Sequence, residues 1–479
     1  MIYIGLDAGT QGARAIAADE RGNVAACASA AYGSINIGEN GLKEQRPEDW
    51  TNACFECLAS IAIQLKNAGR LSEVRALAVD GTSGTLLAVD KDFRPLTNGI
   101  MYNDARSKTQ ADEVQRAGAN VAEKLGYRFN ASYSLPKAVW IRQEKPDVYE
   151  KTRVFCHQTD YIVGALTGEF CVTDYSNALK SGYDIVDLCW PDYISGLIDR
   201  EKLPCVKAPG EIIGRLTADA AKSTGLPEGT AVAAGATDGY VSAVACGAVN
   251  IGDFNSTIGS TLVIKGVSEN IITDPQGRVY CHKHPMGWYY PGGAGNVGGL
   301  CVNAFGKENF DALNAACPAL TPTGALFYPL TAQGERFPFV DADMRGFEYA
   351  PPKTKEGRYA ATLEGVAFVE RMCFELLEGL GCAAGDTIFI AGGAVKSPEW
   401  SQIRANVLGK RLAQPNTIEA AMGTAIIAAT SDGVSIVDAA HSMVSYTARF
   451  EPQMEKTRRY NELHARFKAL VSEKRNEHI

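Results

Sequence analysis

Short apolar stretches alternate along the chain with longer stretches in which apolar residues recur every three or four positions. The apolar runs at residues 2–7, 13–18, 23–28, 74–79 and 86–89 predict strands. A helix is predicted to begin at Pro47 and to end near Gly69, because the apolar side chains between these residues share one face. Strands that alternate with helices in this way are typical of an α/β fold.

The opening hairpin has a weak counterpart in the second half of the chain. Residues 7–12 form a predicted Gly/Thr turn between two strands, and a similar Gly/Ser/Thr turn lies inside a predicted hairpin at 255–263. A helix of small residues at 241–246 precedes this second hairpin. We therefore predict two domains, residues 1–247 and 248–479.

The last part of the chain has the pattern of a surface helix. Tyr460, Leu463, Phe467 and Leu470 recur at helical spacing among many charged residues. An apolar stripe on an otherwise charged segment predicts a helix, at about 454–474, that packs on one domain through a single face.

Composition narrows the classes of function. The 479 residues include 47 Lys and Arg against 55 Asp and Glu, and a net charge of −8 disfavours a nucleic-acid partner. The sequence shows no export signal and no run of 18 apolar residues, so we expect a cytoplasmic protein without a membrane span. The 13 cysteines suit reduced, mostly buried thiols, and we assign the C-x-x-C at Cys54 and Cys57 to packing. A small-molecule partner is the expectation that remains.

Two turns have the residue types of a phosphate site. Asp7 ends an apolar strand and is followed by glycines that allow backbone N–H groups to face a ligand, so phosphate and a divalent cation would fit there. A tight hairpin alone would also explain Gly9 and Gly12. The second turn, at residues 259–261, opens the possibility that both halves of the chain close on one polyphosphate between domains.

Two further segments place polar or small residues at strand ends. Asp238 follows a predicted strand and precedes a helix, where it could cap the helix or accept the proton of an attacking hydroxyl in phosphoryl transfer. Residues 388–400 join a buried strand, a glycine pair and a helix, a pattern that permits close approach of a flat ligand. Neither a P-loop nor a dinucleotide-binding glycine motif is complete in the sequence.

Taken together, several segments resemble the FGGY family of carbohydrate kinases over nearly the whole chain. The segments that carry the resemblance are Ile4–Arg14, Gly41–Trp50, Tyr102–Arg106, Leu166–Gly168 with Thr173–Ser176, Gly235–Asp238, Gly259–Thr261, Gly334–Pro338, Gly392–Trp400 and Glu419–Gly423. The resemblance implies two ribonuclease-H-like domains of the actin-like ATPase type, with a cleft between them, that bind ATP and a sugar. It also implies an enzyme that transfers phosphate to an alcohol group.

The resemblance assigns roles to individual residues. Asp238 would be the catalytic base, and Asp7 would help to place Mg²⁺ and belong to the substrate site. The nucleotide site would consist of Thr10 and Gln11 at the γ-phosphate, Gly259, Ser260, Thr261 and Gly334 at the other phosphates, and Gly393, Ala394, Ser397 and Trp400 around the nucleoside. A Trp at the start of a helix can also serve packing alone, so both interpretations of Trp400 stay open.

The predicted sugar pocket departs from the commonest xylulokinase pattern. Residues 82–85 read Thr-Ser-Gly-Thr where that pattern has Gln-Met-His-Gly, which removes bulk and an imidazole from the pocket wall. Residues 80–85, together with residues 259–261 and 334–339, are similar to the branch of the family that phosphorylates D-ribulose. This similarity makes Ser83 and Asp104 the expected substrate contacts, with a turn serine and a loop aspartate as the alternatives.

We therefore expect ATP-dependent phosphorylation of a ketopentose at its terminal hydroxyl, with D-ribulose and its O5 atom first among the acceptors. D-xylulose, L-ribulose, glycerol and sugar alcohols such as ribitol are the rival acceptors. A non-enzymatic actin-like ATP switch is the alternative class, because the same fold serves both. The assembly that we consider for the chain is a homodimer.

Overall fold

The computed structural model describes residues 1–33 and 42–476, which divide into two compact units. The first unit contains Met1–Val249, His282–Trp288 and Glu419–Ser445, and the second contains the rest of the chain. The boundary predicted after residue 247 lies close to Val249, but the sequence did not indicate that two later segments pack with the first unit. Gly41, the first residue of a segment quoted above, lies outside the described residues.

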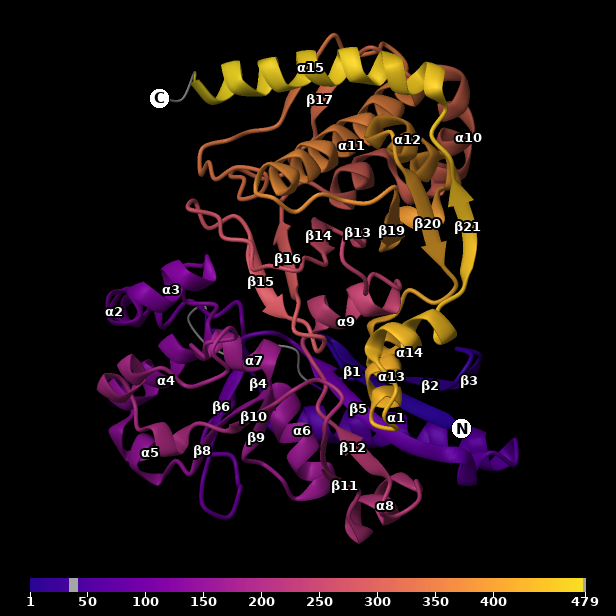
Figure 1. The fold of residues 1–479 in the computed structure, drawn as a ribbon. Helices are drawn as coiled ribbons and strands as arrows, with labels where there is room; N and C mark the ends of the chain where they lie inside the picture. The colour runs from indigo at the N-terminus through magenta and orange to yellow at the C-terminus, as the bar shows by residue number, and fades with distance from the viewer. Residues whose placement is uncertain (34–41, 477–479) are drawn as a thin grey trace. The chain divides into compact units, whose positions relative to one another are not determined.

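A six-stranded sheet forms the centre of the first unit (Figure 1). Its order is β11-β12-β5-β1-β2-β3, in which β1, β5 and β12 run parallel and the other neighbours antiparallel. The strands are β1 (Ile2–Ala8), β2 (Gly12–Asp19), β3 (Val24–Ala31), β5 (Val74–Gly81), β11 (Ile212–Arg215) and β12 (Ala231–Ala233). The strands predicted in the first 79 residues are confirmed to within a few residues at their ends.

The central sheet of the second unit repeats this arrangement. Six of its seven strands follow the order β16-β14-β13-β19-β20-β21, with antiparallel, antiparallel, parallel, parallel and antiparallel pairing. The strands are β13 (Phe254–Ile258), β14 (Leu262–Gly266), β15 (Tyr280–Lys283), β16 (Tyr289–Ala294), β19 (Thr387–Ala391), β20 (Arg411–Pro415) and β21 (Tyr446–Phe450). The weak repeat of hairpins in the sequence therefore corresponds to a repeated sheet topology.

Helices cover both faces of the first sheet. Successive strand residues point to opposite faces, so Ile4 and Leu6 join the core beneath α1, whereas Gly5 faces α13. The helices of this unit are α1 (Pro47–Asn67), α2 (Lys108–Ala117), α3 (Ala119–Leu125), α4 (Ser134–Glu144), α5 (Pro146–Lys151), α6 (Gln158–Thr167), α7 (Tyr175–Lys180), α8 (Ala218–Thr224), α9 (Asp238–Ala245), α13 (Ala420–Thr430) and α14 (Ile436–Met443).

The predicted helix after Pro47 is α1, which buries Cys54 and Cys57 against this core. Burial raises the pKa of the Cys57 thiol to about 11 and raises the pKa of the Cys54 thiol well above its usual value. Both thiols therefore stay protonated and contribute to packing, as the sequence indicated.

Smaller sheets complete both units. A four-stranded sheet in the first unit has the order β4-β7-β6-β8, and two-stranded sheets pair β9 with β10 and β17 with β18. The strands are β4 (Glu44–Gln45), β6 (Leu86–Val89), β7 (Gly99–Ile100), β8 (Val154–His157), β9 (Val172–Asp174), β10 (Cys205–Lys207), β17 (Leu326–Tyr328) and β18 (Phe347–Tyr349). The strand predicted at 86–89 is β6.

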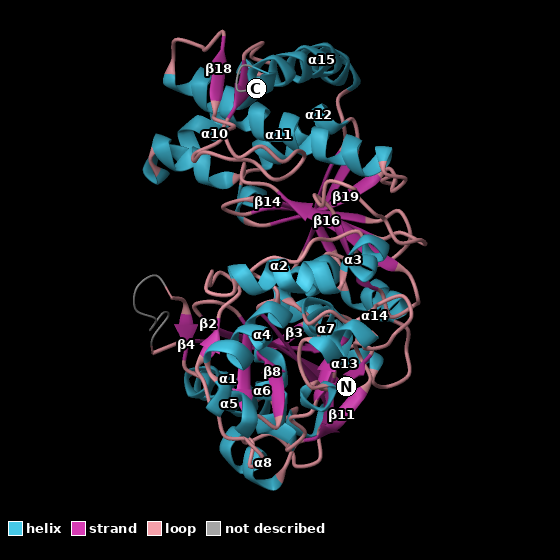
Figure 2. Cartoon of the chain, turned by 90° about the vertical axis from the view of Figure 1, so that its left-hand side faces the viewer, coloured by secondary structure: helices cyan, strands magenta, loops and turns pink. Residues whose placement is uncertain are grey.

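In the second unit the helices lie on one face of the sheet that contains β14, β16 and β19 (Figure 2). They are α10 (Phe310–Leu320), α11 (Lys355–Gly379), α12 (Pro398–Leu408) and α15 (Met454–Asn476). The predicted C-terminal helix is α15, which buries Tyr460, Leu463 and Phe467 against its neighbours and leaves most of its charges exposed. No helix in the described part of the chain has the length and apolar character needed to cross a lipid bilayer.

Candidate active site

Two carboxyl groups lie side by side where β1 and β5 end. The parallel register of these strands pairs Asp7 with Asp80, and both side chains are buried. Burial and the negative charge of Asp238 raise the pKa of Asp7 to about 6, and a hydrogen bond from the Asp80 carboxyl acts in the opposite direction. Burial and the charge of Asp7 raise the pKa of Asp80 well above its usual range. Asp80 is therefore the protonated member of the pair.

Asp238 belongs to the same edge of the sheet. It follows β12, which runs parallel to β5, and it is the first residue of α9. The N-cap of α9 is Thr237, so Asp238 is not the cap, and its exposed side chain accepts a hydrogen bond from the Gly239 N–H at 2.6 Å. Parallel strands place their carboxyl ends together, and this geometry explains why the charge of Asp238 acts on Asp7.

A close approach of two backbones fixes the chain just before Asp238. A Cβ atom on Gly235 would lie 1.8 Å from the carbonyl oxygen of Val79 in β5. Because any side chain would collide with this backbone, only glycine allows β12 and β5 to end together at the site.

The carboxylates of this edge fit a Mg²⁺ ion that is completed by substrate. Within residues 1–33 and 42–476, no group of three or more His, Cys, Asp or Glu side chains could hold a metal ion. Mg²⁺ prefers oxygen ligands and is commonly held by one or two carboxylates together with phosphate oxygens and water. Asp7 offers one such carboxylate, and phosphate oxygens and water would complete the set.

The predicted phosphate-contacting residues of the first unit lie in the turn between β1 and β2. Thr10 is half-buried and Gln11 is exposed. The Gly9 N–H donates to the Gly12 carbonyl at 3.0 Å, and the Thr10 carbonyl accepts a hydrogen bond from Gln45 Nε2 at 2.8 Å. The turn is thus fixed through its backbone atoms, and neither of these two contacts uses the Thr10 or Gln11 side chain.

Ser83 lies in a short turn after β5 that is held by a buried lysine. Its side chain is half-buried, and the next residue, Gly84, accepts a hydrogen bond from Lys137 Nζ at 2.9 Å. Lys137 Nζ also donates to the carbonyls of Ala131 at 2.9 Å and Tyr133 at 3.3 Å. Burial lowers the pKa of Lys137 to about 7. Sequence analysis did not single out this lysine, because its contact with the turn after β5 joins residues 53 positions apart.

The Asp104 side chain is surrounded by groups that donate hydrogen bonds to it. Its carboxylate accepts hydrogen bonds from the backbone N–H groups of Lys43 and Arg106, at 2.6 and 2.9 Å, and from the Arg106 guanidinium at 2.8 and 2.9 Å. The Arg106 contacts hold the pKa of Asp104 below its usual value despite burial. Because the side chain has no exposed surface, Asp104 positions Arg106, which also pairs with Glu44 at 2.7 Å.

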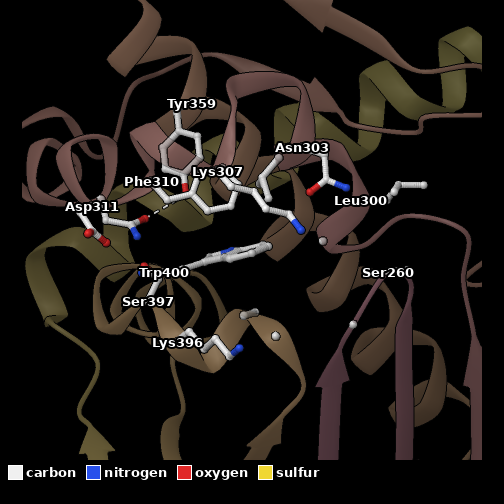
Figure 3. Close-up of a pocket in the computed structure, with 16 residues that line it drawn as sticks. Ser260, Leu300, Asn303, Lys307, Phe310, Asp311, Tyr359, Lys396, Ser397 and Trp400 are labelled. Atoms are coloured by element: carbon white, nitrogen blue, oxygen red, sulfur yellow. Dashed lines mark hydrogen bonds between the residues drawn. The ribbon is translucent and has the colours of Figure 1, made fainter. Parts of the chain in front are cut away.

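A cavity of about 570 Å³ lies entirely within the second unit (Figure 3). Six of the predicted nucleotide-site residues line it, namely Gly259, Ser260, Gly393, Ala394, Ser397 and Trp400. Thr261 and Gly334 are not among the described residues that line it. The Gly334 carbonyl instead accepts a hydrogen bond from Asn296 Nδ2 at 2.9 Å. Asn296 lies in the loop just before Gly299, which lines the cavity.

Local backbone geometry shapes one wall of this cavity. Gly392 has φ of 84°, and a Cβ there would lie 2.4 Å from the Ile258 carbonyl, so glycine is required where β19 ends beside β13. Ser397 then caps α12 by accepting a hydrogen bond from the Trp400 N–H at 3.1 Å. The Trp400 indole lines the cavity and also donates to the Leu363 carbonyl at 3.3 Å. Trp400 therefore contributes to both packing and the cavity wall.

The opposite wall was not predicted from the sequence. It contains Asn303, Lys307, Phe310, Asn314 and Tyr359, and Lys396 extends from the turn below Trp400 in the view of Figure 3. The Tyr359 hydroxyl donates to Asn314 Oδ1 at 2.9 Å, which directs the amide group of Asn314. Asn303 and Lys307 come from two 3-10 turns at 299–305 and 307–309, Phe310 and Asn314 from α10, and Tyr359 from α11. The packing of these elements brings the residues together, and no sequence motif marks them.

Comparison with known proteins identifies the family of the chain. The N-terminal domain pattern of the FGGY family of carbohydrate kinases matches residues 2–245, and the C-terminal domain pattern matches residues 275–431. The chain belongs to the FGGY family of carbohydrate kinases. It is therefore a sugar kinase, a phosphotransferase with an alcohol group as acceptor, in a family that uses ATP.

The similarity to individual FGGY kinases extends over almost the full length. The chain is 28% identical to the xylulose kinase of Bacillus subtilis (strain 168), over 98% of this chain and 96% of that protein. It is 25% identical to the gluconokinase of Bacillus licheniformis, over 99% and 96%. The crystal structure of xylulose kinase from Rhodospirillum rubrum superposes with a TM-score of 0.87 at 26% identity and covers 98% of both chains. The two-domain α/β fold expected from the sequence is thus confirmed.

Proposed function

We propose that this FGGY kinase transfers the γ-phosphoryl group of ATP to the terminal hydroxyl of a ketopentose, and that D-ribulose, converted to D-ribulose 5-phosphate, is its preferred acceptor. The observation that carries the proposal is the exposed carboxylate of Asp238 beside the buried pair of Asp7 and Asp80, at the edge where three parallel strands end. A carboxylate at that place is accessible to an acceptor hydroxyl.

Asp238 would serve as the base of this transfer. Its carboxylate would accept the proton of the acceptor hydroxyl while the hydroxyl oxygen bonds to the γ-phosphorus and the bond to the β-phosphate oxygen breaks, which leaves ADP. Asp7 would hold Mg²⁺, which when bound neutralises negative charge on the phosphates. Thr10 and Gln11 would contact the γ-phosphate from their turn. Phosphoryl transfer depends mainly on such positioning and charge.

The second unit would supply the nucleotide site. Trp400 and the backbone at Gly393 and Ala394 would frame the nucleoside, while Gly259 and Ser260 would contact phosphates. An aromatic wall suits a nucleobase, which has two flat apolar faces. Thr261 and Gly334 would contribute by fixing the loops next to these contacts.

The preference for D-ribulose is supported by the turn after β5. Ser83 is small and half-buried there, and Lys137 holds its neighbour Gly84 in place. We propose that Ser83 contacts the sugar and that Asp104 acts on the site through Arg106. D-xylulose is the second candidate acceptor, because relatives that match over most of the chain, such as the Bacillus subtilis protein, are xylulose kinases.

Replacement of Asp238 tests the proposed mechanism. We expect Asp238→Asn to lower kcat for sugar phosphorylation at least about 100-fold, since general-base assistance contributes about 10²–10⁴ in rate, and to leave the Kd for ATP within about twofold. The matched control is Asp219→Asn, because Asp219 also lies in the first turn of a helix in the first unit. Steady-state kinetics and isothermal titration of ATP give both quantities. Near-normal turnover by Asp238→Asn would remove Asp238 from the role of base.

A further inference from the structure

The main chain just before Asp238 runs between the central sheet of the first unit and α7. β12 pairs with β5 on one side and with β11 on the other, and the pairing with β11 ends at Ala233. On the β5 side, a further bridge joins Gly81 to Thr237, the N-cap residue of α9. The β5 side of the sheet therefore follows the chain up to Asp238, whereas β11 stops several residues earlier.

A side-chain hydroxyl from α7 holds this stretch on its other side. Ser176 Oγ accepts a hydrogen bond from the backbone N–H of Thr237 at 2.8 Å. Both residues are 1% exposed, so water cannot readily replace the serine as the acceptor. A buried backbone N–H that loses its acceptor is costly, because it keeps no compensation for its lost hydration. Ser176 thus supplies a bond that the sheet does not give to Thr237.

The Ser176 hydroxyl is itself fixed by a buried network. Asp174 caps α7 by accepting hydrogen bonds from the Ser176 N–H, at 2.8 Å, and from the Ser176 hydroxyl. Because the hydroxyl hydrogen is donated to Asp174, the oxygen is left as an acceptor for Thr237. Asn177 Nδ2 donates to Asp174 Oδ2 at 2.6 Å and to Thr159 Oγ1, in α6, at 2.9 Å. Buried networks of this kind hold side chains in one arrangement.

The position of Asp238 depends on the main chain that this network fixes. Asp238 is the residue directly after Thr237, and its side chain is exposed. An exposed side chain is placed mainly by the backbone that carries it, and here the backbone is held between the Gly81 bridge and the Ser176 hydroxyl. In catalysis, a misplacement of about 1 Å can lower a rate about 100-fold. A contact to the Thr237 backbone can therefore affect turnover.

We propose that Ser176 is a positioning residue for phosphoryl transfer, whose hydroxyl fixes the main chain at Thr237 and thereby holds the Asp238 carboxylate in place for the acceptor hydroxyl. This inference rests on the proposed role of Asp238. Ser176 is buried and acts through the backbone, so its loss should slow turnover without weakening the binding of ATP or sugar.

Removal of the hydroxyl gives the kinetic test in the full-length enzyme. We expect Ser176→Ala to lower kcat about tenfold or more with D-ribulose or D-xylulose as acceptor, because the base is displaced. The Kd for ATP and the KM for the sugar should stay within about twofold of the wild type. Isothermal titration and steady-state kinetics measure these quantities. Ser176→Cys places a weakly accepting sulfur atom at the same position and should lower kcat in the same direction, which preserves the test if Ser176→Ala does not fold.

Ser181→Ala is the matched control. Ser181 is the C-cap residue of the same helix, is also buried, and loses a hydrogen bond to His157 Nε2 of 2.9 Å. Ser181→Ala should keep kcat within about twofold of the wild type, because its hydroxyl does not contact the Thr237 backbone. A wild-type kcat in Ser176→Ala would overturn the proposal. An equal loss of kcat in the two alanine variants would also overturn it, since the loss would then reflect a destabilised α7.

Hydrogen–deuterium exchange tests the contact without any measurement of activity. In the full chain, mass spectrometry of the peptide that contains Thr237 should show this amide exchanging about tenfold faster in Ser176→Ala, and at the wild-type rate in Ser181→Ala. Unchanged exchange in Ser176→Ala would contradict the inference while leaving the proposed role of Asp238 intact. Faster exchange together with near-normal turnover by Asp238→Asn would instead refute the proposed base, and this inference with it, although the hydrogen bond would stand.

Discussion

At the residue scale, the neighbouring carboxyl groups of Asp7 and Asp80 differ in protonation state. Asp80 has no exposed surface and also accepts a hydrogen bond from Thr424 Oγ1, while Asp7 lies nearer to solvent. The pKa of Asp7 is about 6, so its ionised form dominates above that pH and is lost as pH falls through it. If Asp7 holds Mg²⁺, activity should fall along the same limb.

Replacement of Asp80 tests its effect on the pKa of Asp7. We expect Asp80→Asn to leave the acid limb of kcat/KM near pH 6, because an amide still donates to Asp7 and accepts from Thr424. Asp80→Leu removes the donor that lowers the pKa of Asp7, so the limb should move to higher pH. Profiles of kcat/KM against pH, with thermal melts to confirm folding, give the comparison. Equal limbs in both variants would show that Asp80 does not act on Asp7.

Sequence reasoning reached some site residues and missed others for physical reasons. Asp7 and Asp238 stand at strand ends next to glycines, where local pattern is informative. Asp80 follows the same rule, but its role depends on the parallel register with β1. Lys137 donates to the carbonyl of Gly84, 53 positions earlier in the chain, and no spacing in the sequence encodes that contact.

At the element scale, the first residues of α12 stabilise the helix and also line the cavity. Ser397 caps the helix and lines the cavity. We expect Ser397→Ala to lower the free energy of unfolding by about 1 kcal/mol, the usual cost of a lost N-cap, and to weaken ATP binding several-fold. Isothermal titration and denaturant unfolding measure the two effects.

Ser435→Ala is the matched control for Ser397→Ala. Ser435 caps α14 in the first unit, and its Oγ atom accepts from the Asp438 N–H at 3.1 Å, the same distance as in the Ser397 cap. It should cost a similar free energy without change in ATP affinity. Equal ATP affinity in Ser397→Ala and the wild type would exclude the α12 cap from the nucleotide site.

At the scale of the whole molecule, a late segment of the chain completes the first unit. Residues 419–445 pack with the first 249, and α13 covers the face of β1 that Gly5 occupies. The sequence predicted the strands, the repeated hairpin and the last helix, because these depend on local pattern. The partnership of β1 with α13 joins residues more than 400 positions apart, so pattern alone could not reveal it.

The contact between β1 and α13 makes Gly5 a sensitive position. A Cβ on Gly5 would lie 1.8 Å from the Ala421 carbonyl oxygen. We expect Gly5→Ala to lower the free energy of unfolding by about 3 kcal/mol, since overpacking of a close contact costs about 1–3 kcal/mol or more. Gly196→Ala is the control, because a Cβ there meets nothing within 4 Å. Equal denaturant midpoints for the two variants would contradict the close packing of α13.

The most direct measurement is a comparison of kcat/KM for a panel of free sugars with ATP, with each phosphorylated product identified by NMR. The panel contains D-ribulose, D-xylulose, L-ribulose, D-gluconate, glycerol and ribitol. We expect D-ribulose to give the highest value and D-ribulose 5-phosphate as product, with D-xylulose at least about tenfold lower, a difference that one hydroxyl contact can supply. A higher kcat/KM for D-xylulose or another acceptor, or phosphate on an atom other than the terminal O5, would contradict the proposed acceptor.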